Sequence, residues 1–251
     1  MRRFAIAEAV FLVVSAITPC WASSSEPDIQ IPNAVDPMQW NDAQAILSKT
    51  SAVIARFKSE PKMAALARQA RGIFVVPQFG HGTSPTTGSW GSGVLLASDH
   101  GQWSDPVFFT LGGGSLGPHV TANGGALILF VMTDRAMAKF KKLSNWSLSS
   151  APGTAIVSYS AATPQDLSGH GSDIVAWSAA GGANADTELN ITDIGFDTAL
   201  NSTVYGTPDL RSILANEAPY INQTVINLRR EMPSTAIATT PNVQDPPLRR
   251  G

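Results

Sequence analysis

The sequence predicts an α+β fold, in which N-terminal and peripheral helices pack on a curved antiparallel β-sheet of barrel-like or sandwich-like form. Between residues 70 and 132, short apolar runs alternate with clusters of glycine, a pattern typical of buried strands joined by tight turns. The connections in this stretch are too short for a crossover helix, so neighbouring strands should be antiparallel. Amphipathic helical patterns flank the stretch on both sides.

The composition suits one domain of ordinary size and excludes some functions. The chain has 251 residues, of which only 14% are charged, and its net charge is -2. Its 17 Lys and Arg residues are scattered, which argues against a nucleic-acid partner. The single cysteine, Cys20, excludes an internal disulfide framework.

The N-terminus has the pattern of a secretory signal peptide, residues 1–22. Two arginines precede an apolar run at residues 9–17, and small residues follow it, with cleavage expected after Ala22. The run is too short to span a bilayer as a mature helix. We therefore expect an exported protein, and lipidation of Cys20 is the alternative fate of this N-terminus.

Two helices should precede the strands. After a flexible lead at residues 23–35, Asp36 is the expected N-cap of a helix with Pro37 at its first position. The apolar stripe of this helix is formed by Trp40, Ala43, Leu47, Ile54 and Phe57. Pro61 should begin a second short helix, with Ser59 as its cap.

A basic helix is expected after the strands. Thr133 or Asp134 can cap a helix that runs through Leu143. Its densest basic face is formed by Arg135, Lys139 and Lys142. Such a face is either simply solvated or a binding face for lipid headgroups, because anionic lipid attracts basic clusters by about 1 kcal/mol per charge.

The remaining elements are shorter. Residues 154–160, 173–178 and 188–194 are predicted as strands, the last of them half-exposed. Thr207 and Pro208 should begin a helix that turns its leucines and isoleucine inward.

The domain organisation follows from these elements. We expect the domain to cover residues 36–218, followed by a C-terminal extension at 219–232 that could form a helix. A tail at 233–251 lacks apolar periodicity and should be disordered.

One glycine-rich turn carries two patterns that resemble catalytic motifs. Residues 112–117 satisfy G-x-G-x-x-G, and residues 113–117 satisfy the G-x-S-x-G of serine hydrolases, with Ser115 as nucleophile. Both motifs require a helix directly after the turn, whereas Pro118 and further glycines follow here. A glycine-rich hairpin is therefore favoured over an active site. The histidines lack metal-ligand spacing, so we expect no metal. Because the two motifs of the glycine-rich turn lack the helix that they require, we also expect no cofactor and no enzyme.

Six motifs in order resemble those of the SYLF-domain family of lipid-binding proteins. They lie at residues 70–72, 76–77, 91–94, 103–106, 113–117 and 205–206. The resemblance implies an α+β domain that binds acidic phospholipids, without catalytic activity; some eukaryotic members also bind actin. Bacterial members are secreted proteins or lipoproteins, which implies a location in the periplasm or cell envelope. A lysine typical of the family is absent from the turn at residues 179–181, which weakens the expected affinity for anionic lipid.

The residues and the resemblance together predict an exported, non-enzymatic phospholipid-binding protein of the bacterial cell envelope. Its expected partners are acidic phospholipid headgroups, and its expected lipid-binding residues are Arg71, Arg135, Lys139 and Lys142. Two alternatives stay open. One is a serine hydrolase that uses Ser115, and the other is a structural protein of the envelope that binds a protein partner.

Overall fold

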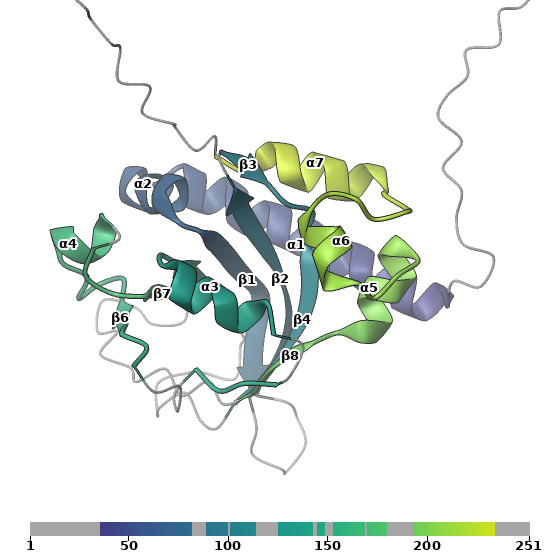
Figure 1. Cartoon of the computed structure of the whole chain (residues 1–251), viewed down its shortest axis with the longest axis horizontal. Helices are drawn as coiled ribbons and strands as arrows, with labels where there is room; N and C mark the ends of the chain where they lie inside the picture. The colour runs from purple at the N-terminus through teal and green to yellow at the C-terminus, as the bar shows by residue number, and fades with distance from the viewer. Residues whose placement is uncertain are drawn as a thin grey trace, which may run out of the picture.

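The computed structural model describes residues 36–81, 89–99, 101–113, 125–142, 145–148, 153–168, 170–179 and 193–233 (Figure 1). The signal peptide with Cys20, the flexible lead, most of the glycine-rich turn with Ser115, Leu143 and nearly all of the C-terminal tail lie outside these ranges. The described residues form helices around a strongly curled sheet that makes a half-barrel, which confirms the α+β fold with a curved sheet.

Within the described residues, the sheet has eight strands in the order β6-β7-β5-β1-β2-β4-β8, and β3 pairs with β2 outside this path. The strands are β1 (Gly72–His81), β2 (Ser89–Asp99), β3 (Gln102–Trp103), β4 (Val107–Gly113), β5 (Gly125–Val131), β6 (Ile156–Ser158), β7 (Ile174–Ser178) and β8 (Asp193–Phe196). Strand β8 includes the last two residues of the strand predicted at 188–194, and residues 188–192 lie outside the described residues.

The expectation of an antiparallel sheet fails at one pair. All neighbouring strands are antiparallel except β6 and β7, which are parallel, so the sheet is mixed. Residues 159–173 join these two strands and contain the short helix α4 (Pro164–Leu167). This connection is long enough to return the chain to the same end of the sheet, which parallel pairing requires.

The central strand β1 is interrupted by a bulge. Its register shifts between Val75 and Gly80 against β2, and between Val76 and Phe79 against β5. Pro77 lies in this bulge, where a residue without a backbone N–H is tolerated. The facing strand β2 has glycine there: a Cβ at Gly91 would lie 2.6 Å from a Val76 methyl group. The bulge and the glycine together curl the sheet.

The helices are α1 (Pro37–Lys58), α2 (Pro61–Gln69), α3 (Asp134–Phe140), α5 (Thr198–Tyr205), α6 (Leu210–Leu214) and α7 (Gln223–Glu231). Asp36 caps α1 by accepting a hydrogen bond from the Met38 N–H, as predicted. Ser59 does not cap α2: it is the C-cap of α1, and the N-cap of α2 is Glu60, which makes no side-chain cap. Only Glu60 lies between Ser59 and Pro61. Ser59 therefore ends α1, and Glu60 occupies the N-cap position of α2.

The helix predicted to begin at Thr207 begins later. Helix α6 starts at Leu210, and Asp209 caps it by accepting from the Arg211 and Ser212 N–H groups. The preceding residues form a helix that the sequence analysis did not predict, α5, which ends at Gly206 in the left-handed conformation. Pro208 therefore lies in the link between two helices.

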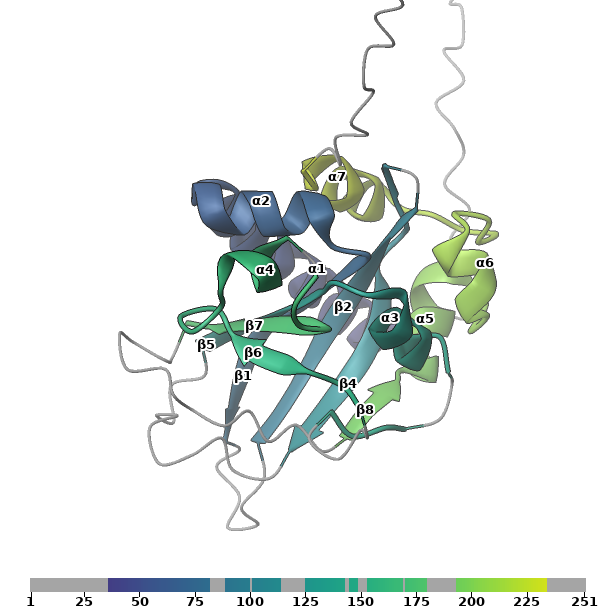
Figure 2. The same cartoon turned by 60° about the vertical axis from the view of Figure 1, so that its left-hand side comes forward.

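Helices cover both faces of the sheet. Figures 1 and 2 show α1 behind the strands and α3 in front of them. On the α1 side, Phe57 contacts Phe130 of β5, whereas on the α3 side Phe140 contacts Phe74 and Phe109. Burial on both faces explains why the strands are continuous apolar runs and do not alternate with polar residues.

The last helix, α7, lies along the first. Glu231 accepts a hydrogen bond from Ser51 at 2.5 Å, and the Thr224 hydroxyl donates to Gln44 at 2.8 Å. Val225 and Leu228 of α7 are buried. Among the helices of the described residues, none has both the length and the apolar character needed to cross a bilayer.

Candidate functional site

A pocket of about 520 Å³ opens at the end of the sheet where β1 begins and β2 ends, between α3 and α6. Its charged lining residues are Arg71, Asp99, Asp134, Lys141 and Arg211. Its apolar lining includes Met137, Leu210 and Leu214. Charged groups from several elements thus meet around an apolar floor, an arrangement typical of ligand sites.

Arg71 is held in the pocket by the sheet. Its N–H donates to the Val131 carbonyl and its carbonyl accepts from the Ser98 N–H, at 2.8 and 2.9 Å. The next residue, Gly72, leaves room for the pocket floor, because a Cβ there would lie 2.9 Å from the Met137 sulfur. In the Ala-Arg-Gly motif, the backbone of Arg71 is therefore held by the sheet, and Gly72 leaves space for the Met137 side chain.

The Arg71 side chain pairs loosely with the first turn of α3. Its Nε lies 3.4 Å from an Asp134 carboxylate oxygen, and both side chains are largely exposed, by 58% and 86%. An exposed pair of this kind contributes little to stability. Both groups remain accessible to a ligand at the pocket mouth.

Helix α3 divides its charged residues between two sides. Asp134, Met137 and Lys141 follow the helical spacing of one face, and all three line the pocket. Arg135 and Lys139 belong to another face, and neither lines the pocket. The basic face predicted from sequence is therefore directed elsewhere.

Arg135 is engaged in a structural ion pair. Its guanidinium binds the carboxylate of Asp173 through Nη2 at 2.5 Å and Nε at 3.3 Å. The same carboxylate accepts from the Thr133 hydroxyl and from the Ala155 N–H. Burial alone would raise the pKa of Asp173, but the hydrogen bonds from Arg135, Thr133 and Ala155 outweigh it and hold the pKa below its usual value. Arg135 thus ties α3 to the start of β7.

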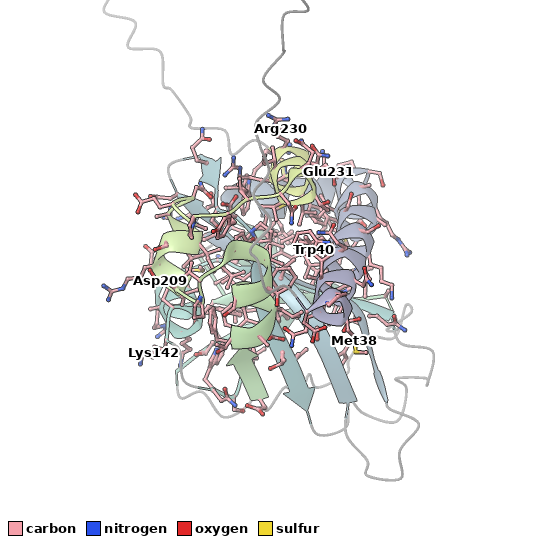
Figure 3. The ribbon with its side chains drawn as sticks, turned by 90° about the vertical axis from the view of Figure 1, so that its right-hand side faces the viewer. Met38, Trp40, Lys142, Asp209, Arg230 and Glu231 are labelled. Carbon is pink, nitrogen blue, oxygen red and sulfur yellow. The ribbon has the colours of Figure 1, made fainter. Side chains whose placement is uncertain are left out.

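The four predicted lipid-binding residues do not form one cluster. Of Arg71, Arg135, Lys139 and Lys142, only Arg71 lines the pocket. Lys139 is half-buried, whereas Lys142 is exposed and extends from the edge of the molecule (Figure 3).

The sequence analysis missed Lys141 and Arg211. Lys141 could have been found from its spacing to Asp134 and Met137 on α3. Arg211 has no local signal, because its place beside the pocket depends on how α6 docks on the sheet.

A single asparagine anchors the end of α6. Asn216 has a positive φ of 61°, which Asn tolerates better than most residues. Its amide oxygen accepts from the Asp105 N–H at 2.6 Å and its amide nitrogen donates to the Trp103 carbonyl at 3.3 Å. The Trp-Ser-Asp-Pro motif therefore positions the wall of the pocket that carries Arg211 and Leu214.

The same motif contributes a buried ion pair beneath α7. Arg229 lies 2.9 Å from one carboxylate oxygen of Asp105, whose side chain is 1% exposed. Burial raises the pKa of Asp105, and the charge and hydrogen bond of Arg229 only partly oppose this. The Trp103 indole N–H donates to the Pro233 carbonyl, and the Tyr205 hydroxyl donates to the Pro106 carbonyl. These residues join α5 and α7 to the sheet, so their role is structural.

The described part of the chain offers no metal site, because no three of its His, Cys, Asp and Glu residues lie close enough to hold an ion. The hydrolase hypothesis depends on Ser115, which lies outside the described residues.

Comparison with known proteins finds one family model that matches about half of the chain. The model of the Ysc84 family, described as Las17-binding protein actin regulator, matches residues 112–233, which contain both helical walls of the pocket. No curated protein matches the chain. The match over residues 112–233 supports membership of the Ysc84 or SYLF-domain family, which the motifs also indicate, and is consistent with a lipid-binding or actin-related domain.

Proposed function

We propose that this protein binds acidic phospholipid headgroups, without catalysis, at the pocket between α3 and α6. The observation that carries the proposal is the convergence of Arg71, Lys141 and Arg211, from three separate elements, on one open pocket. Arginine and lysine are the side chains that best bind phosphate oxygens. The apolar floor suits the glycerol and first acyl carbons of a lipid.

The remaining basic residues of α3 would support this contact. Lys142 is exposed directly after Lys141, and Lys139 lies one turn before Lys142. Each charge near an anionic surface adds about 1 kcal/mol of attraction, which falls off within a Debye length. In this proposal Arg71 binds the headgroup, Lys139 and Lys142 attract the membrane, and Arg135 orients α3 through Asp173.

The proposed location is the periplasm or the cell envelope, because residues 1–22 have the pattern of a signal peptide. Mass spectrometry of the mature N-terminus tests this directly. A start at residue 23 supports cleavage by signal peptidase, whereas a start at a lipidated Cys20 supports a membrane anchor. An intact Met1 in protein isolated from its own cells would overturn the proposed export.

Cosedimentation of residues 23–251 with vesicles tests the binding itself. We expect the protein to bind vesicles that contain phosphatidylglycerol, to bind more weakly at high salt, and to ignore pure phosphatidylcholine. Reversal of two of the three basic pocket residues, Lys141→Glu with Arg211→Glu, should weaken binding at least about tenfold.

Arg230→Glu is the matched control. Arg230 is exposed on α7 and extends from a different edge of the molecule than Lys142 (Figure 3). Because it does not line the pocket, its reversal should leave most of the binding intact. Equal losses per reversed charge in the two variants would mean that only total charge matters. Failure of the wild type to bind any vesicle would overturn the proposal and favour a protein partner in the envelope.

A further inference from the structure

The pocket carries two carboxylates among its three cations. Asp99 and Asp134 line it together with Arg71, Lys141 and Arg211, which leaves one net positive charge. A ligand with only negative groups would meet repulsion from these carboxylates. A ligand that joins a phosphate to an ammonium group would satisfy both kinds of lining residue.

We infer that, among headgroups with a net negative charge, the pocket selects those that carry a primary ammonium group beside the phosphate, of the phosphoserine type. This inference rests on the proposed function and names the headgroup class for the same site. The phosphate and the serine carboxylate would contact the cations of the pocket, and the ammonium would contact Asp134. The pocket would then select a headgroup by the positions of its charges as well as by its total charge.

Asp134 is the residue best placed to receive the ammonium. It occupies the first turn of α3, and 86% of its side chain is exposed at the pocket. Its contact with Arg71 joins one guanidinium nitrogen to one carboxylate oxygen at 3.4 Å. A guanidinium has five N–H donors and a carboxylate has two acceptor oxygens. Within the described residues, the pair therefore retains donors for a phosphate and an acceptor for an ammonium.

The dimensions agree with this ligand. A volume of about 520 Å³ falls in the range of small-molecule sites, about 300 to 1,000 Å³. Met137, Leu210 and Leu214 give an apolar surface for the carbon atoms between the charged groups. A polyanionic headgroup of similar size would instead place a phosphate opposite Asp134 and lose affinity.

Vesicles that contain equal mole fractions of phosphatidylserine or phosphatidylglycerol provide the test. Both lipids carry one net negative charge, so the surface potentials match, and only phosphatidylserine carries an ammonium. We expect the wild type to bind phosphatidylserine vesicles about two- to fivefold more tightly, the range that one exposed ion pair supports.

Asp134→Asn should remove this preference. The variant loses the acceptor for the ammonium and releases Arg71, so it should bind phosphatidylglycerol at least as tightly as the wild type does. Asp193→Asn is the control, because Asp193 is an exposed acid at the opposite end of the sheet, paired in register with Gly112. The control should keep the preference for phosphatidylserine.

The outcomes separate this inference from the proposed function. Equal binding of the wild type to both lipids would overturn the inference and leave phospholipid binding in place, whereas no binding to either would overturn both. If Asp134→Asn weakened the binding of both lipids equally, the role of Asp134 would be structural. This result would overturn its assignment as the group that contacts the ammonium.

Soluble headgroups distinguish a membrane lipid from a free compound. Glycerophosphoserine should displace the protein from phosphatidylserine vesicles better than glycerophosphoglycerol does, and equal displacement would contradict the inference. Tighter binding of the soluble compound than of the vesicle would support a free ligand with the same chemistry. Weaker binding of the soluble compound than of the vesicle would support a membrane lipid as the ligand.

Discussion

Two carboxylates of this protein, Asp173 and Asp105, are buried beside one arginine each, yet their pKa values move in opposite directions. The Asp173 side chain is 4% exposed and that of Asp105 is 1% exposed. The pKa of Asp173 is lowered because its hydrogen bonds outweigh its burial, whereas burial dominates at Asp105 and raises its pKa.

The difference lies in the number of donors. Asp173 accepts four hydrogen bonds, from Thr133, from two nitrogens of Arg135 and from the Ala155 backbone. At Asp105, Arg229 binds Oδ1, and Oδ2 is buried with no partner among the described residues. A single ion pair therefore does not compensate a carboxylate for loss of water, but a full set of donors does.

The largest predicted effect comes from removing the partner of Asp105. Arg229→Ala leaves a buried carboxylate without any charge partner, which should lower the free energy of unfolding by about 3–5 kcal/mol. Urea unfolding at pH 7 measures this. Arg135→Ala should cost less, about 1–2 kcal/mol, because Thr133 and Ala155 still donate to Asp173. An equal loss in the two variants would contradict the role assigned to donor number.

A smaller effect, with a defined pH dependence, is predicted for Asp173→Asn. Because the folded pKa of Asp173 is lowered, its ionised form stabilises the protein above the ordinary pKa near 3.8, and this stabilisation is lost as the pH falls through the folded value. We expect the variant to be about 1–3 kcal/mol less stable at pH 7. The difference should shrink in urea titrations taken progressively below pH 4. A difference that stays constant with pH would show that the charge of Asp173 is unimportant.

The smallest effect is predicted for Asp105→Asn, with the opposite pH dependence. The raised pKa means that the fold favours the protonated form, so the contribution of Asp105 is present at low pH and declines as the pH rises through the folded pKa. The variant should lie within about 1 kcal/mol of the wild type at pH 7. Its stability relative to the wild type should increase between pH 4 and pH 7. If Asp105→Asn lost several kcal/mol of unfolding free energy at pH 7, and this loss disappeared in acid, Asp105 would behave like Asp173. The contrast between the two carboxylates would then be wrong.

Much of the fold could be predicted because its signals are local. The cap at Asp36 and the apolar stripe of α1 each depend on residues within one helix, and the strand runs are continuous because both sheet faces are covered. Helix α5 was missed because residues 201–203 are Asn, Ser and Thr, which have low helix propensity. The side chain of Asn201 instead bonds the Phe108 backbone through its oxygen and its nitrogen, a tertiary contact that no local pattern reveals.

The candidate site was only partly predictable for the same reason. Arg71 was identified from its motif and does line the pocket. The basic face of α3 was recognised from spacing, but spacing does not indicate that Asp173, far along the chain, will engage Arg135. Arg211 reaches the pocket through the docking of α6, which depends on the two hydrogen bonds of Asn216.

The pairing of α1 with α7 determines when the domain can finish folding. Ser51 and Glu231 are 180 positions apart, so their contact is among the most non-local kind a domain of this size can form. During synthesis α1 leaves the ribosome long before α7 exists, and the side of α1 that contacts α7 in the folded domain stays uncovered in the meantime. The contact between α1 and α7 therefore cannot form until α7 has been synthesised and has left the ribosome.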